Sequence, residues 1–140
     1  PATEKIFSPE GALEHYAELS PEDRATISAL LKNDAALAAK CLASWGVKEV
    51  IITQGSLGSL IYAQGEFCRI PAYAPREVVD ATGCGDTYMA GYLYMRNKGC
   101  SCYESGCFAA AMSTLKLEHS GPFCGTEEDI QQIVNSGQRP

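Results

Sequence analysis

The stretch "DATGCGD", residues 80–86, places two carboxylates around a run of small residues. The apolar run "TYMAGYLYM" follows directly and predicts a helix that begins at this stretch. Glycines ahead of a helix let backbone N–H groups converge on one point, and the positive end of the helix dipole adds to their attraction for an anion. Gly83, Cys84 and Gly85 are therefore candidates for a cradle that binds an oxyanion or a phosphate group.

Asp86 would stand just inside this helix, beside the bound anion. Because a carboxylate cannot itself bind phosphate, its task there would be to take a proton from a hydroxyl group that attacks the phosphate. An alternative needs no chemistry: Asp86 complements the helix dipole and the glycines form a tight turn. The residue types alone do not decide between the two. A Walker A loop is absent, and Tyr88 stands where the dinucleotide fingerprint needs a third glycine.

A second glycine-rich stretch, "TQGSLGS" at residues 53–59, follows the apolar run "KEVIIT" at 48–53, which predicts a buried strand. Alone, this stretch is typical of a turn. Two glycine-rich turns at strand ends can converge on one polyphosphate at the carboxyl edge of a sheet. Together the two stretches favour a nucleotide site.

The surrounding elements predict a single α/β domain over residues 1–140. A hairpin is expected around Gln64-Gly65, and "REVVD" at 76–80 predicts a short strand before the first glycine-rich stretch. In the first part of the chain, helices are expected at 8–19, after the cap Ser20, and between a cap at Asn33 or Asp34 and an end at Gly46. In the second part, a helix of about 14 residues is expected to end at Gly99, and another to run from Ser101 to about Leu117. A last amphipathic helix is expected after the cap Thr126.

The composition excludes several classes of function. The net charge is −6 and no stretch gathers enough Lys and Arg to neutralise a nucleic-acid backbone. The apolar runs are shorter than the roughly 20 residues that span a bilayer, and no signal peptide is present, so we expect a cytoplasmic protein away from membranes. The seven cysteines contain no C-x-x-C pair, which favours reduced structural thiols over a redox or metal protein.

From about residue 33 onward, the chain resembles the C-terminal half of a ribokinase-like, PfkB-family carbohydrate kinase. The family signature D-T-x-G-A-G-D is matched by residues 80–86, and its upstream T-x-G-x-x-G turn by residues 53–58. The helix "CFAAAMSTLKLEHSG" at 107–121 resembles the one that flanks the adenine. The resemblance implies a ribokinase-like fold, with helices packed on a mostly parallel sheet.

The resemblance also implies roles for particular residues. Asp86 takes the position of the catalytic base that deprotonates the acceptor hydroxyl, and Gly83, Cys84 and Gly85 form the anion hole over the transferred γ-phosphoryl group. Asp80 and Thr82, with carbonyl groups near residues 116–125, match a loop that binds a monovalent cation such as K⁺ in many members. The residues implied to line ATP are Thr53, Gly55, Ser56, Gly58, Gly85, Phe108 and Ala111.

The implied reaction is an ATP- and Mg²⁺-dependent phosphoryl transfer to an alcohol group of a sugar or nucleoside. Ala81 and Cys84 replace the usual Thr and Ala, and the N-x-x-E motif linked to magnesium has no clear match. The chain begins at Pro1 without an initiator Met, and the family's N-terminal half, with its sugar-binding residues and lid, has no counterpart. A nucleotide-binding fragment or degenerate relative without turnover is therefore the alternative. An uncovered sheet edge or apolar face predicts self-association or a partner chain.

Overall fold

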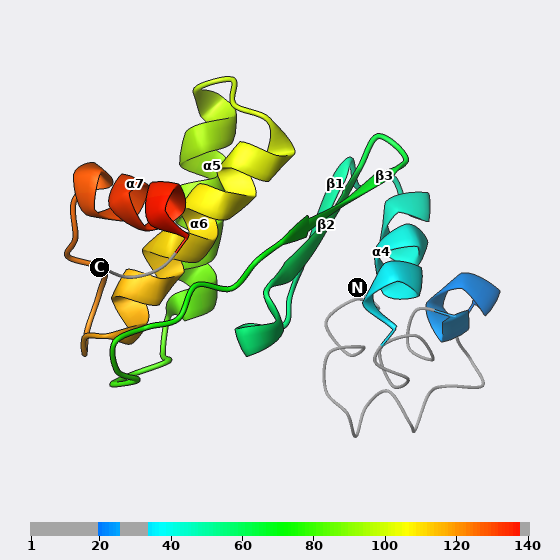
Figure 1. Ribbon diagram of the computed structural model, residues 1–140. Coiled ribbons are helices and arrows are strands. Elements are labelled where there is room, and N and C mark those ends of the chain that lie inside the picture. The colour runs from blue at the N-terminus through cyan, green and yellow to red at the C-terminus, as the bar shows by residue number, and fades with distance from the viewer. Residues whose placement is uncertain (1–19, 26–33, 138–140) are drawn as a thin grey trace. The chain divides into compact units, whose positions relative to one another are not determined.

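The computed structural model describes residues 20–25 and 34–137 (Figure 1). They belong to two compact units, residues 1–50 and 51–140. The single domain expected over residues 1–140 stays a prediction. The helix expected at 8–19 lies outside the described residues.

In the first unit, the predicted helix starts are confirmed. The hydroxyl of Ser20 accepts a hydrogen bond from the N–H of Asp23 at 3.1 Å, and helix follows from residue 21. Helix α4 (Ala35–Ser44) begins after Asp34, whose carboxylate accepts from the N–H of Leu37 at 2.9 Å. Of the two caps considered, Asp34 is therefore the one used.

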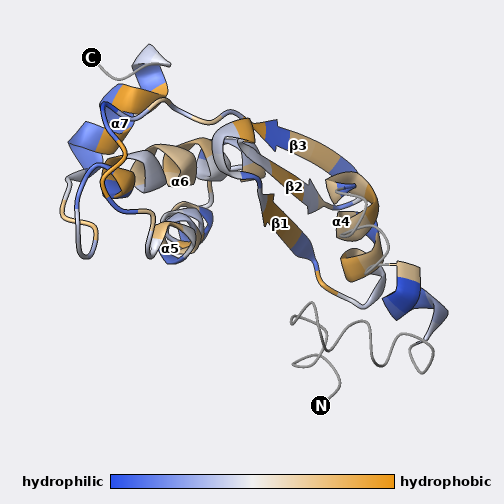
Figure 2. Ribbon diagram, turned by 90° about the horizontal axis from the view of Figure 1, so that it is seen from below, coloured by the Kyte–Doolittle hydropathy of each residue, from blue (hydrophilic) through white to orange (hydrophobic). Residues whose placement is uncertain are grey.

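The sheet has three strands in the order β1 (Glu49–Thr53), β2 (Ser59–Ala63) and β3 (Glu66–Ile70). Apolar residues make up most of β1 and β2 (Figure 2). The predicted hairpin is confirmed: β2 and β3 pair antiparallel, and Gln64 and Gly65 at its tip both have positive φ, as a type I′ turn requires. The pairing of β2 with β3 is antiparallel, and the mostly parallel sheet stays a prediction.

Three helices complete the second unit: α5 (Cys84–Asn97), α6 (Cys102–Leu117) and α7 (Glu127–Ser136). Their ends follow the prediction, with capping boxes at the start of α6 and α7 and a left-handed Gly99 after α5. Helix α6 lies between α5 and α7 and also contacts β2 and β3 (Figure 1). Among the described residues, no helix combines the length and apolar character needed to cross a membrane.

Helix α6 forms the centre of the core because ten of its residues are buried. Its approach to the hairpin depends on Gly106, where a Cβ would lie 2.6 Å from the side chain of Ile70 and 2.8 Å from that of Ile61. Both isoleucines are almost fully buried and have little room to move aside. Gly91 likewise allows α5 and α6 to approach closely, since a Cβ there would lie 3.2 Å from the Cα of Ala109.

Candidate functional site

Residues 80–86 form a turn that leads directly into α5. Gly83 is the N-cap residue and has a left-handed conformation, with φ +79°. The N–H of Cys84 donates to the carbonyl of Ala81 at 3.2 Å, and the N–H of Thr87 donates to the carbonyl of Gly83 at 2.9 Å. A left-handed conformation costs a residue with a Cβ about 1–2 kcal/mol, so glycine at position 83 sets the entry into the helix.

The first turn of α5 leaves backbone donors available. Within the described residues, the amides of Gly85 and Asp86 have no acceptor, as is normal for the first turn of a helix. The amide of Cys84 is already bonded to Ala81, so the three-residue cradle expected at 83–85 differs from the set of available donors. The amide of Gly83, like those of Gly85 and Asp86, has no acceptor among the described residues.

Gly85 has no structural reason to be glycine. It lies inside a helix, where glycine costs about 1 kcal/mol relative to alanine. Its φ is not in the left-handed range, and a Cβ placed there would have no atom within 4 Å. The side-chain volume is open to solvent, which leaves room for a ligand to approach the backbone closely.

Asp86 is the third residue of α5 and is exposed. Its carboxylate makes no hydrogen bond or ion pair with any other described residue. An unpaired carboxylate beside two unpaired amides is an arrangement that can accept a proton next to a bound anion. The same position also complements the helix dipole, so the alternative without chemistry remains compatible with the structure.

The two glycine-rich stretches are joined by a buried hydrogen bond. The hydroxyl oxygens of Ser59 and Tyr88 lie 2.6 Å apart, and these residues are 4% and 5% exposed. Ser59 directly follows Gly58, and Tyr88 stands two residues after Asp86. Burial raises the pKa of the Tyr88 phenol, which therefore stays protonated at neutral pH. This pair links β2 to α5, and the convergence of the two stretches on one polyphosphate stays a prediction.

The turn at residues 54–58 has a fixed backbone shape. It contains a short 3₁₀ helix, η2 (Gly55–Leu57), closed by a 2.8 Å hydrogen bond from the N–H of Gln54 to the carbonyl of Gly58. Gly58 has φ +91° and ψ −145°, and a Cβ there would collide with the carbonyl oxygen of Ile70. Thr53, Gly55 and Ser56, expected to line ATP, are exposed.

Two other residues expected beside ATP are placed differently. Phe108 and Ala111 are 3% and 0% exposed and belong to the hydrophobic core. The ring of Phe108 lies 5.9 Å from that of Tyr94, between α6 and α5. Neither side chain presents a surface to a ligand in this structure, because α6 directs them into the core.

The strand predicted at 76–80 is wrong. The N–H groups of Val79 and Asp80 both donate to the carbonyl of Leu117, at 2.9 and 3.2 Å, and the N–H of Arg76 donates to the Glu118 carboxylate at 2.8 Å. The segment therefore follows the C-terminal end of α6 instead of pairing with a strand. Three of the five residues are charged, and Val78 is 70% exposed, so the segment does not enter the core.

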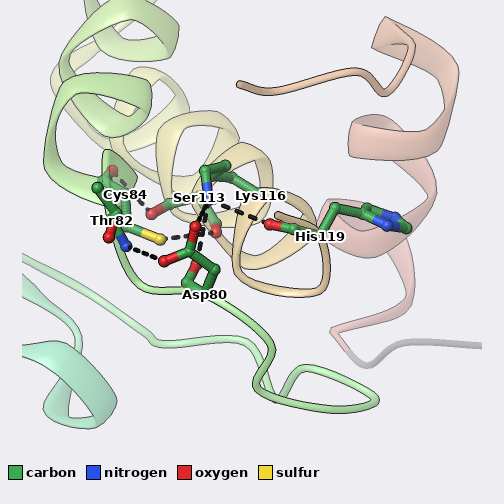
Figure 3. Close-up of polar contacts among 6 residues, drawn as sticks. All are labelled: Asp80, Thr82, Cys84, Ser113, Lys116 and His119. Atoms are coloured by element: carbon green, nitrogen blue, oxygen red, sulfur yellow. Dashed lines mark hydrogen bonds and ion pairs between the residues drawn. The ribbon is translucent and has the colours of Figure 1, made fainter. Parts of the chain in front are cut away.

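Lys116 lies at the centre of the polar contacts behind the α5 turn (Figure 3). Its ammonium group donates to the carbonyls of Asp80 and His119, both at 3.1 Å, and lies 3.8 Å from the Asp80 carboxylate. The other carboxylate oxygen of Asp80 accepts from the N–H of Thr82 at 2.9 Å. Hydrogen bonds from Thr82, and then the charge of Lys116, hold the pKa of Asp80 below its usual value.

The ligand set expected for a monovalent cation comprised Asp80, Thr82 and carbonyls near residues 116–125. In the structure, Asp80 and the carbonyl of His119 already surround the ammonium group of Lys116. Thr82 donates its N–H to the Asp80 carboxylate. These residues do not fit a further cation at the same point, because like charges this close repel each other strongly.

Sequence reasoning missed the contacts that hold α5 against α6. The hydroxyl of Ser113 donates to the carbonyl of Cys84 at 3.0 Å, and the Cys84 thiol donates to the carbonyl of Ser113 at 3.8 Å. The sequence feature that could have pointed to polar contacts in this region was Lys116, a charged residue among the apolar residues of a helix.

Within the described residues, no group of three or more His, Cys, Asp or Glu side chains is arranged to hold a metal ion.

A family model described as pfkB family carbohydrate kinase matches residues 17–128. The chain belongs to the pfkB family. Among curated relatives, this pfkB-family chain is 37% identical over 75 residues to the nucleoside kinase of Methanocaldococcus jannaschii and 38% identical over 81 residues to the cytidine kinase of Thermococcus kodakarensis. These matches take in 54% and 56% of the chain, but only 25% and 29% of the relatives' lengths.

Solved structures confirm the ribokinase-like α/β fold of this pfkB-family chain. The M. jannaschii nucleoside kinase matches 93% of the chain with a TM-score of 0.65 and 26% identity, over 44% of its own length. The Arabidopsis thaliana ribokinase, solved with ribose and ATP, matches 71% of the chain with a TM-score of 0.64 and 32% identity, over 33% of its own length. The chain thus corresponds to less than half of each of these kinases.

Proposed function

We propose that this pfkB-family chain binds ATP and contributes the general base and the anion-binding amides for transfer of the γ-phosphoryl group to a hydroxyl group of a sugar or nucleoside. The observation that carries the proposal is the start of α5, where the free carboxylate of Asp86 stands beside the free amides of residues 85 and 86. The names of the relatives support the acceptor class, since they include nucleoside kinase, cytidine kinase and ribokinase.

The proposed chemistry follows from these groups. The amides at the start of α5 bind oxygens of the transferring phosphoryl group, and the helix dipole adds to their attraction. Asp86 accepts the proton of the acceptor hydroxyl, whose oxygen then forms a bond to the γ-phosphorus while the bond to the bridging oxygen of ADP breaks. The exposed backbone of Gly55 and Ser56 lines the remaining phosphates.

Mg²⁺ is proposed to arrive with ATP. A structure of a putative ribokinase from Escherichia coli was solved with ATP and Mg²⁺. In such sites the ion is held largely by phosphate oxygens and waters, with only one or two carboxylates from the protein. Bound Mg²⁺ would neutralise charge on the phosphates, and Asp86 would stay available as the base.

Gly85→Ala tests the role of the amides. We expect the variant to be as stable as the parent or more stable by up to about 1 kcal/mol, because alanine favours the helix and its Cβ meets no neighbouring atom. We expect its affinity for ATP to fall at least about tenfold, which is about 1.4 kcal/mol, since the Cβ takes the space of the phosphate. Calorimetric ATP titration and thermal unfolding measure the two quantities.

The matched control for Gly85→Ala is Ala90→Ser, which changes an exposed position further along the same helix. It should leave ATP affinity unchanged. If Gly85→Ala bound ATP within a factor of about two of the parent, less than about 0.5 kcal/mol, the open space at residue 85 would not be a phosphate site.

The second candidate function is nucleotide binding without turnover. It is favoured by the small share of the curated relatives that the chain matches. We expect the 140-residue chain to bind ATP but to transfer no phosphoryl group to a panel of nucleosides and sugars, because phosphoryl transfer requires an in-line acceptor in a site that excludes water. Coupled ADP-release assays on the purified chain measure this, and rapid acceptor-dependent turnover would contradict it.

A further inference from the structure

Lys116 is the one lysine that is buried among residues 20–25 and 34–137. It is 3% exposed, although a lysine ammonium is rarely removed from water unless it is paired. Its partners are all oxygens: two backbone carbonyls and, at 3.8 Å, one carboxylate oxygen of Asp80. Carbonyl and carboxylate oxygens are also the ligands that hard metal cations prefer.

The partners of Lys116 come from two separate connections. Asp80 lies directly before the turn into α5, and His119 lies just after α6. The ammonium group therefore joins these two connections, as a bound cation between two loops would. Figure 3 shows the ammonium nitrogen between the Asp80 oxygens and the His119 carbonyl.

We propose that the ammonium group of Lys116 replaces a monovalent metal cation in this chain, so that the shape of the turn at residues 80–83 does not depend on K⁺. The K⁺ site implied by the family resemblance is thus filled by a side chain. The inference concerns the local fold of the site, and it holds whether or not the chain transfers phosphoryl groups.

The replacement has a direct effect on the start of α5. Lys116 holds the carbonyl and the carboxylate of Asp80, and that carboxylate in turn accepts the N–H of Thr82 at 2.9 Å. The Lys116 stem also runs beside Gly83, where a Cβ would lie 3.9 Å from its Cε atom. Lys116 is therefore a positioning residue for the turn that precedes the free amides.

The test compares thermal unfolding in KCl and in tetramethylammonium chloride at equal ionic strength. A cation that binds only the folded state raises the unfolding temperature with its concentration, whereas screening is the same in both salts. For the parent chain we expect no difference between the two salts beyond about 1 °C, less than the effect of a ligand at its dissociation constant. A saturable increase specific to K⁺ in the parent would overturn the proposal.

Lys116→Met removes the charge and keeps a side chain of similar length. We expect its unfolding temperature to fall by about 10 °C in tetramethylammonium chloride, because the Asp80 carboxylate loses its cation. K⁺ should then recover a saturable part of this loss, a response that a purely steric role of Lys116 would not produce. A folded Lys116→Met variant that ignores K⁺ would overturn the proposal. The control Lys48→Met removes an exposed lysine and should respond to neither salt.

A second measurement tests the proposal on the parent chain, so it applies even if Lys116→Met does not fold. Thallium(I) substitutes for K⁺ and can be followed by ²⁰⁵Tl NMR, so it is titrated into the parent chain directly. We expect no saturable change of the thallium signal. Saturable binding of thallium(I) that K⁺ displaces would show a separate cation site and overturn the proposal.

Discussion

Asp86→Asn is expected to lower kcat for phosphoryl transfer by about 10²–10⁴-fold, because an amide cannot accept the proton of the acceptor hydroxyl. The ATP affinity should stay within a factor of about three, since a group that acts only in the transition state changes kcat and not ground-state binding. The rates are measured as acceptor-dependent ADP release. The assay uses a chimera in which the N-terminal part of the M. jannaschii nucleoside kinase precedes the chain.

The matched control for Asp86→Asn is Glu128→Gln, which removes an exposed acidic residue from the first turn of α7. Both substitutions weaken a favourable dipole interaction by about 0.3–1 kcal/mol, so they should have similar, small effects on stability. Only Asp86→Asn should lower kcat. If both variants turned over at the parental rate, Asp86 would serve the helix dipole alone.

Gly58→Ala is expected to lower the free energy of unfolding by about 3 kcal/mol or more. Two independent costs add up: the backbone region at φ +91° and ψ −145° is open essentially only to glycine, and the new Cβ would collide with the carbonyl oxygen of Ile70. A backbone carbonyl within a strand pair cannot move aside as a flexible side chain would. Urea unfolding followed by circular dichroism measures the loss.

Gly55→Ala is the control within the same turn. Gly55 also has positive φ, at +56°, but a Cβ there would have no atom within 4 Å. Only the left-handed backbone is then unfavourable, and we expect a loss of about 1–2 kcal/mol. Equal losses for the two variants would mean that the contact with Ile70 does not restrict residue 58.

The ends of the helices could be predicted from the sequence because the groups that cap them are local. Each cap is a side-chain oxygen that accepts from the N–H three residues further on, at Ser20, Asp34, Ser101 and Thr126. The hairpin tip at Gln64-Gly65 is likewise determined by its own backbone conformation. Contacts over such short sequence distances can be identified from residue types and spacing.

The wrong predictions concern contacts between residues that are far apart in the sequence. The segment 76–80, "REVVD", was predicted to be a strand, but its amides bond to Leu117 and Glu118, about 40 residues further along the chain. No local pattern distinguishes a strand from an extended segment held by a helix end.

For the candidate site, the motif predicted where Asp86 and the helix start would lie. It did not predict which amides are already bonded, nor that the ammonium group of Lys116 donates to the carbonyls of Asp80 and His119. The burial of Phe108 and Ala111 also depends on which face α6 turns toward its neighbours. These features follow from packing, which a single sequence does not specify.

The C-terminal end of α6 lies near the start of α5, and local contacts offset the negative end of the α6 dipole. The Ser113–Cys84 hydrogen bonds hold the two helices together, so the negative end of one dipole lies close to the positive end of the other. Two amides donate to the Leu117 carbonyl, and the Lys116 ammonium donates to the carbonyl of His119 just beyond the end of α6. These contacts offset the negative end of α6, while the amides of residues 85 and 86 at the start of α5 keep no acceptor among the described residues. A chain with a net charge of −6 can thus present an electropositive point to a polyphosphate.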